Sequence, residues 1–241
     1  MDKELRVVIL AAGKGTRMNS SLPKVLHKLC GKSLIDYVLD ESELFKPVEV
    51  ILVVGFEKNK VILHTENREN IKYCTQSDQL GTGHAVLQTE ELLKNKKGHI
   101  LILYGDVPNI KSSTLQPIID DHVKNNRDLT LITAELENPY GYGRIIRDKN
   151  GSLLKIVEEK DCNDDEKKIK EWNPGIYIFK IPEVFDILNK IKANNASEEY
   201  YLTDAIGIAQ QANMHIEAIK IANSKEVIGV NTADQLEELE S

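Results

Sequence analysis

The sequence predicts an α/β protein built around a doubly wound, mostly parallel β-sheet of the Rossmann-like kind. Two observations carry this prediction. Short aliphatic runs, each about the length of one strand, alternate with amphipathic segments that have helical spacing. Three of these runs (VVILAA, VEVILVVG and HILILYGD) are apolar at nearly every position. Such continuous runs are typical of parallel strands that are covered on both faces.

The first half of the chain supplies the parallel part of this sheet. Strands are expected, in chain order, at residues 7–12, 48–55, 71–76 and 99–106. Helices are expected between them at residues 31–44, 56–64 and 84–94. In the first helix, Leu34, Ile35, Val38 and Leu39 fall on one face, which predicts that this face packs on the sheet.

The second half has strands with shorter links, which predicts antiparallel strands that extend or cover the sheet. They are expected at residues 128–136, 143–148, 152–159 and 175–180, with a hairpin turn at Asn150-Gly151. The charged run 161–172 is expected to be a solvated helix or loop. A helix at 200–212, a strand at 216–222 and a polar helix at 233–241 complete the chain. Because no repeat or linker interrupts it, we expect a single domain spanning residues 1–241.

Composition excludes several classes of function. The formal net charge of -7 argues against a nucleic-acid partner. The three cysteines (Cys30, Cys74 and Cys162) have neither metal-site spacing nor the density of a disulfide framework, which predicts a reducing compartment and thus the cytoplasm. The apolar run at 7–12 is too short for a signal peptide or a membrane span, so no membrane association is expected.

The loop after the first strand contains two glycines at the edge where α/β sheets bind ligands. The dinucleotide fingerprint G-x-G-x-x-G begins at Gly13 and Gly15 but fails at Met18. The acidic residue about 20 positions on, Asp36, lies within a helical pattern and not at a strand end. The glycine spacing of the Walker motif is also absent. Neither standard nucleotide motif is therefore present.

The same loop is nevertheless suited to phosphates. Glycine backbone N–H groups form anion-binding nests. Lys14, Arg17 and Lys24 lie within a dozen residues and together can neutralise a triphosphate. A surface turn with solvated lysines is the alternative, and the loop alone leaves both interpretations open.

A set of further motifs follows the glycine loop in a fixed order. LAAGKGTRM is followed by LPKVLH, QLGTGHA, LYGDVP, GYGRI, IVEEKD, NPGIY, YYLTD and GVN. Each motif alone is weak, but the ordered set resembles the sugar-nucleotide nucleotidyltransferases. Within them it is most similar to the uridylyltransferase domain of the bifunctional bacterial enzymes that make UDP-N-acetylglucosamine. The resemblance covers nearly the whole chain and implies a nucleotide-binding part at about 1–112 and a sugar-binding part at about 113–241.

The resemblance implies a Mg²⁺-dependent transfer of UMP from UTP to N-acetylglucosamine 1-phosphate, with release of pyrophosphate, for cell-wall precursor synthesis. The attacking phosphate is already an anion at neutral pH, so the reaction needs positioning and charge neutralisation and no general base. One alternative is the same chemistry on another sugar 1-phosphate or with another nucleotide. The other is a nucleotide-sugar-binding module without turnover. The oligomeric state is left open.

The resemblance also assigns roles to individual residues. The nucleotide would be lined by Leu10, Ala11, Ala12 and Gly13. The catalytic cations would be Arg17 and Lys24, which meet the phosphates. The uracil would be read by Gln76, Gly81 and Thr82. The sugar would be held by Tyr104, Gly143, Glu158 and Asn173. The magnesium ligands would be Asp106 and Asn231, with Asn231 also touching the substrate.

Three departures from the family pattern bear on specificity and scope. Pro174 stands where a small hydroxyl residue commonly follows the asparagine, and Ala233 stands where arginine is common. Both leave the sugar specificity open. The chain ends at Ser241 without isoleucine-patterned hexapeptide repeats. We therefore expect it to lack the acetyltransferase activity, and the trimer, that a β-helix domain supplies. Trp172 is expected to be a packing anchor, and His27 and His84 to be structural.

Overall fold

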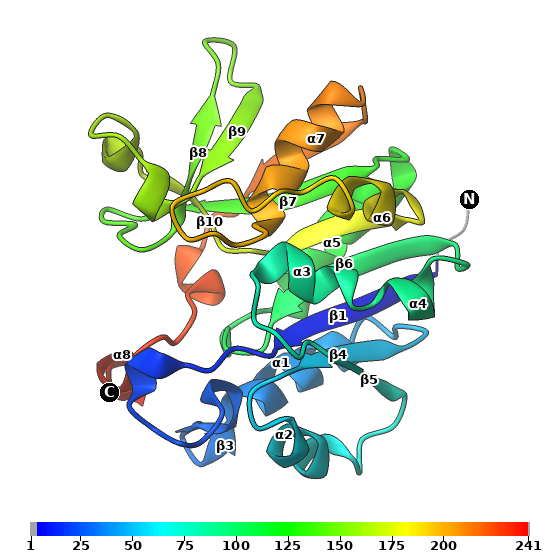
Figure 1. Cartoon of the computed structure of the whole chain (residues 1–241), viewed down its shortest axis with the longest axis vertical. Coiled ribbons are helices and arrows are strands. Elements are labelled where there is room, and N and C mark those ends of the chain that lie inside the picture. The colour runs from blue at the N-terminus through cyan, green and yellow to red at the C-terminus, as the bar shows by residue number, and fades with distance from the viewer. Residues whose placement is uncertain (1–3, 241) are drawn as a thin grey trace.

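The computed structural model of the protein describes residues 4–240, with a ten-stranded mixed sheet at its centre (Figure 1). The parallel part has the order β5-β4-β1-β6. Its strands are β1 (Leu5–Ala11), β4 (Val50–Val54), β5 (Ile71–Thr75) and β6 (Gly98–Tyr104). All four predicted strands of the first half are thus confirmed. Since they are parallel, their carboxyl ends meet at one edge of the sheet.

The sheet continues past β6 through β11 (Tyr177–Ile181), which pairs antiparallel with both β6 and β7 (Leu129–Glu135). Beyond β7 lie three short strands. They are β10 (Glu171–Asn173), β8 (Gly143–Arg147) and β9 (Leu153–Val157). The strands β8 and β9 form the hairpin predicted at Asn150-Gly151. A further strand, β12 (Ile216–Lys220), pairs parallel with β7.

Helices cover both faces of the sheet and enclose two hydrophobic cores. Along β1, Val7 and Ile9 belong to one core and Val8 and Leu10 to the other, as the continuous apolar run predicted. The first core is closed by α1 (Leu34–Glu43), α2 (Lys58–Thr65) and α5 (Ser112–Lys124). The second is closed by α3 (Thr82–Leu87), α4 (Glu90–Leu93), α6 (Glu183–Leu188) and α7 (Ala205–Gln211).

Several elements differ from the sequence prediction. The helix expected at 84–94 is broken in two, because the Thr89 hydroxyl donates to the Val86 carbonyl within the helical stretch. The helices α5 and α6 and the small hairpin of β2 (Lys28–Leu29) and β3 (Lys32–Ser33) were not predicted. The charged run after Asp161 is loop and 3₁₀ turn, as expected, but it ends in strand β10.

The start of α5 shows why sequence alone missed it. Its first residues are Ser112, Ser113 and Thr114, and Pro117 lies inside the helix, so the pattern resembles a loop. The backbone N–H of Ser112 donates to the Glu41 carboxylate on α1 at 2.7 Å. This cap comes from a different helix and is therefore invisible in the local sequence.

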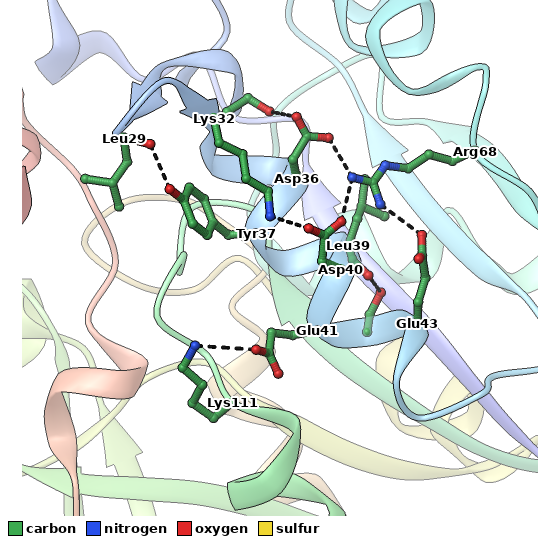
Figure 2. A network of polar contacts seen from close by, with 12 residues as sticks. Leu29, Lys32, Asp36, Tyr37, Leu39, Asp40, Glu41, Glu43, Arg68 and Lys111 are labelled. Atoms are coloured by element: carbon green, nitrogen blue, oxygen red, sulfur yellow. Dashed lines mark hydrogen bonds and ion pairs between the residues drawn. The ribbon is translucent and has the colours of Figure 1, made fainter.

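A polar network holds α1 against its neighbours (Figure 2). Arg68, just beyond α2, donates to Asp36, Asp40 and Glu43 on α1 at 2.8–3.0 Å. Burial alone would raise the pKa of Asp36, but hydrogen bonds from Ser33, His64 and Arg68 hold that pKa below its usual value. Asp36 is therefore a structural carboxylate of this network. It lies within a helix and not at the end of a strand, as predicted.

A buried histidine pair lies at the far end of β6 from the candidate site. His99 and His122 are 3.0 Å apart between Nδ1 and Nε2, and His122 Nδ1 lies 2.8 Å from the Thr130 hydroxyl. Burial, with the positive charges of His99 and Arg127 next, lowers the pKa of His122 to about 3. His122 therefore stays neutral in the folded protein at pH values where the unfolded chain takes up a proton.

We expect this pair to make the protein less stable as the pH falls. Below the unfolded pKa of about 6.5 the unfolded chain binds the extra proton, so the free energy of unfolding falls by up to about 1.4 kcal/mol per pH unit until the folded pKa is reached. Urea unfolding at pH 7 and pH 5 measures this loss. The slope should shrink in His122→Gln and persist in Lys149→Gln, a change at an exposed residue that does not contribute to the pKa of His122. Equal slopes in both variants would rule out His122 as the source.

Among residues 4–240, no helix is long and apolar enough to cross a membrane. No disulfide joins the three cysteines, which all lie within the described residues; Cys74 and Cys162 are buried and Cys30 is exposed.

Candidate active site

A cavity of about 470 Å³ opens at the edge where the carboxyl ends of the parallel strands meet. It lies between the loop after β1, the end of β6, the start of α3 and the β8–β9 side of the sheet. Every residue to which the family resemblance assigns a role lines it: Leu10, Ala11, Ala12, Gly13, Arg17, Lys24, Gln76, Gly81, Thr82, Tyr104, Asp106, Gly143, Glu158, Asn173 and Asn231. Residues from eight of the sequence motifs, together with Gln76, are thus brought to one cavity, although their individual roles stay proposals.

The glycine loop continues β1 straight into this cavity. Gly15 has a left-handed backbone with φ of 60°, and a Cβ there would lie 2.7 Å from the Cβ of Lys24. Glycine therefore allows the segment that carries Lys24 to pack directly on the loop. Lys14 is not among the residues that line the cavity, and its Nζ lies 5.7 Å from the centre of the Phe56 ring. Of the three loop cations, only Arg17 and Lys24 reach the cavity.

Two cationic and two oxygen-bearing side chains converge on one side of the cavity. Lys24 forms an ion pair with Asp106, and its Nζ donates to the Asn231 side-chain carbonyl at 3.0 Å. Arg17 donates to the same oxygen at 3.2 Å. Asn231 is more than 200 residues away from Arg17 in sequence. In Figure 1 the C-terminal helix α8 (Ala233–Glu240) accordingly lies beside the segment that follows β1.

The donor set of Asp106 and Asn231 fits a hard divalent cation. Both oxygens contact the single ammonium group of Lys24, so they are close enough for one small cation to touch both. Within the described part of the chain no group of three or more His, Cys, Asp or Glu residues forms a metal cage. One carboxylate and one amide oxygen are typical of Mg²⁺ sites that take their remaining ligands from phosphates and water.

The opposite wall is formed by β5 and the start of α3. Gln76 is nearly fully buried, and its side-chain amide lies 3.0 Å from the Gly81 carbonyl and 3.1 Å from His84 Nδ1. His84 is thus a structural neighbour of Gln76, as predicted. Gly81 and Gly83 pack against the backbone of Tyr200, where a Cβ would come within 3 Å of a backbone atom. These contacts fix a rigid polar edge that suits a planar base.

A third wall presents hydrogen-bonding groups from β9 and β8. The Glu158 carboxylate accepts a hydrogen bond from the Thr203 hydroxyl at 3.0 Å and lies beside Gly143. Burial raises the pKa of Glu158, and the charges of Asp204 and Asp161 raise it further, while the Thr203 hydrogen bond lowers it. Thr203 was not among the predicted site residues, although its motif YYLTD was noted.

The floor of the cavity contains Tyr104 and Asn173. Asn173 donates to the Tyr177 hydroxyl at 2.8 Å and accepts from the Gly175 backbone at 3.0 Å. Burial raises the pKa of Tyr104, so its hydroxyl stays protonated. Gly175 has φ of 83°, and a Cβ there would clash with the Tyr104 ring. Pro174, one of the departures from the family pattern, also lines the cavity.

Sequence reasoning missed several lining residues that act through their neighbours. Tyr142 lines the cavity and packs at a tilt against the fully buried Trp172, with ring centres 4.1 Å apart, which confirms Trp172 as a packing anchor. Arg144 is buried and paired with Glu159, which also accepts from the Gly141 backbone. The GYGRI motif marks this loop in the sequence. The pairing of Arg144 with Glu159 is a tertiary contact that the motif does not reveal.

Comparison with known proteins identifies the family of the chain. The profile of the family described as nucleotidyl transferase matches residues 6–224. Bifunctional protein GlmU of Clostridium acetobutylicum is 45% identical over 229 residues, which cover 95% of this chain and 50% of that protein. The same protein of Clostridium botulinum is 44% identical over 97% of this chain and 50% of its own length. The chain thus spans about half the length of the curated relatives it matches.

A solved structure confirms the fold at lower sequence identity. UDP-glucose pyrophosphorylase, in complex with UDP-glucose, superposes with a TM-score of 0.76 at 21% identity, covering 98% of this chain and 97% of that chain. The predicted Rossmann-like nucleotidyltransferase fold is therefore confirmed. Because the family profile covers most of the chain and the cavity gathers its predicted site residues, the protein belongs to the nucleotidyl transferase family.

Proposed function

We propose that this chain transfers UMP from UTP to N-acetylglucosamine 1-phosphate, giving UDP-N-acetylglucosamine and pyrophosphate. The observation that carries the proposal is that Arg17, Lys24, Asp106 and Asn231 converge at one point of the cavity. The same cavity is lined by the wall of Gln76, which suits a planar base, and by the wall of Glu158, which is rich in hydrogen-bonding groups. The GlmU relatives, 44–45% identical over nearly the whole chain, support it. Binding alone does not require two cations, a carboxylate and an amide oxygen at one point.

The chemistry follows from where charge develops. An oxygen of the sugar phosphate attacks the α-phosphorus of UTP, the bond from that phosphorus to the bridging oxygen breaks, and pyrophosphate leaves with the electron pair. Arg17 and Lys24 bind the phosphates and neutralise negative charge as it moves toward the leaving group. No proton has to be removed from the attacking phosphate, so this step needs no general base.

Members of this family generally use a divalent metal ion, and we assign magnesium to Asp106 and Asn231. When bound, magnesium supplies positive charge that stabilises the phosphate oxygens. In this assignment Asp106 provides the anionic ligand and Asn231 a neutral one, while Lys24 moves from Asp106 to a phosphate. Gln76, Gly81 and Thr82 contact the base, and Tyr104, Gly143, Glu158 and Asn173 contact the sugar.

The proposal is tested by incubating the purified chain with UTP, Mg²⁺ and a panel of sugar 1-phosphates while pyrophosphate is measured. Release that depends on N-acetylglucosamine 1-phosphate supports it. Release with a different sugar ester or nucleotide identifies another transferase on the same scaffold. Binding of UTP without release in any mixture identifies a non-catalytic module. The cytoplasmic location and the single-domain assignment stay predictions.

Replacing Glu158 should weaken binding of the sugar 1-phosphate alone. Because Glu158→Gln removes a charged acceptor, we expect KM for the sugar 1-phosphate to rise about tenfold or more, since hydrogen bonds to charged groups contribute about 1.5–3 kcal/mol. The affinity for UTP should not change, because Glu158 is assigned to the sugar and not to the base. Initial rates over a matrix of both substrates measure this, with the exposed Glu137→Gln as control. A rise in KM for UTP alone would contradict the placement.

A further inference from the structure

Asn231 is held by the helix that follows it. Its side-chain oxygen faces Arg17 and Lys24, while its backbone N–H points the other way and donates to the Gln235 side-chain oxygen at 2.7 Å. Gln235 lies on the first turn of α8, at the third helical residue. The two ends of Asn231 are therefore fixed by different parts of the fold.

The contact belongs to a capping arrangement at the start of α8. The Thr232 hydroxyl accepts from the Gln235 backbone N–H at 3.2 Å, as an N-cap residue does in a capping box. In the usual box the third-position side chain reaches back to the N–H of the N-cap residue itself. Here the Gln235 side chain reaches one residue further, to Asn231. This shift connects the helix start directly to the cavity.

The rest of the segment is anchored as well. The Val230 backbone N–H donates to the Asp106 carbonyl at 2.9 Å, which places Asn231 next to Asp106. Val230 is fully buried with Leu29 and Leu34, and Leu236 of α8 packs on the same small cluster. The helix is thus docked on the body of the protein, and Gln235 transmits that fixed position to Asn231.

We infer that Gln235 is a positioning residue for the reaction, holding Asn231 so that its side-chain oxygen faces the phosphates and Asp106. This inference rests on the proposed function, in which Asn231 touches phosphate and metal. Gln235 itself does not line the cavity and acts only through Asn231. When a contact that orients a metal-ligating residue is removed, metal affinity or activity typically falls by about tenfold to a hundredfold.

The test compares three variants of the whole chain. Gln235→Ala removes the acceptor, and Gln235→Glu keeps an acceptor oxygen and is favoured at this helical position. Glu237→Ala changes an exposed residue of the same helix. We expect Gln235→Ala to lower kcat about tenfold to a hundredfold and to raise the Mg²⁺ concentration needed for half-maximal rate. KM for the sugar 1-phosphate should stay unchanged. Gln235→Glu should restore most of the rate, and Glu237→Ala should behave as wild type.

A second measurement needs no substrate. Hydrogen exchange of the Asn231 amide, followed by NMR in the ligand-free protein, should be slow in wild type and Gln235→Glu and faster in Gln235→Ala. The inference is overturned if Gln235→Ala keeps the wild-type rate, if its Asn231 amide stays protected, or if Gln235→Glu restores nothing. Should wild type release no pyrophosphate from any substrate pair, the proposed function fails, while the exchange measurement still decides whether Gln235 holds Asn231.

Discussion

Asp106→Ala is expected to abolish turnover while leaving the fold intact. Under the proposed function Asp106 is the sole anionic metal ligand, and metal stabilisation of developing charge contributes several kcal/mol, on the order of a thousandfold or more in rate. The segment around Asn231 should survive the change, because the Asp106 backbone carbonyl, and not its side chain, accepts the hydrogen bond from Val230. The loss should therefore appear in kcat and not in stability.

Pyrophosphate release at saturating substrates measures this loss, and urea unfolding checks the fold. Asp120→Ala, which removes an exposed carboxylate on α5, is the matched control and should keep the wild-type rate. Near-normal turnover by Asp106→Ala would contradict the metal assignment. A large drop in the free energy of unfolding would instead show that the carboxylate stabilises the fold through its pair with Lys24.

Lys24→Met is expected to have the second-largest effect. Its side chain is mostly buried, and its ammonium contacts both Asp106 and Asn231. Removing a preorganised donor that stabilises charge in the transition state typically costs about a hundredfold to a thousandfold in kcat. Binding of UTP should weaken as well, because the same charge attracts the triphosphate before the reaction.

The control for this change is Lys28→Met, which removes an exposed lysine four residues along the same segment. The double variant Lys24→Met/Asp106→Ala should be less impaired than the product of the two single losses, since residues in direct contact are not additive. Full additivity would mean that the two side chains act independently. Wild-type kinetics in Lys24→Met would remove it from the catalytic set.

Much of the fold could be predicted from sequence because its signals are local. The continuous apolar runs of β1 and β6 are buried on both faces, and residues along β1 alternate between two cores. Proline and serine inside α5 concealed a helix whose cap comes from Glu41 on α1. The strand β10 was missed because only three residues form it, and they are ordered by pairing with β7 and β8.

The candidate site shows the same division between features with local sequence signals and features that depend on tertiary contacts. Ordered motifs contain all the predicted site residues except Gln76, and the parallel topology brings Gly13, Gln76 and Asp106 to one edge. The motifs did not reveal how these residues are supported. Thr203 and Glu158 are in contact but lie in segments whose spacing in the sequence does not indicate it. Gln235 contacts Asn231 through a helix cap that is shifted by one residue from the usual pattern. Lys14 looked like a third phosphate cation, yet it lies over Phe56.

The central claim is that this cavity moves the UMP unit of UTP onto a sugar 1-phosphate. The most direct measurement uses two batches of UTP, one labelled at the α-phosphorus and one at the γ-phosphorus, each incubated with the chain, Mg²⁺ and N-acetylglucosamine 1-phosphate. We predict that the α label appears in UDP-N-acetylglucosamine and the γ label in pyrophosphate, in equal amounts. Transfer of the γ label to the sugar ester, or retention of both labels in UTP, would contradict the account.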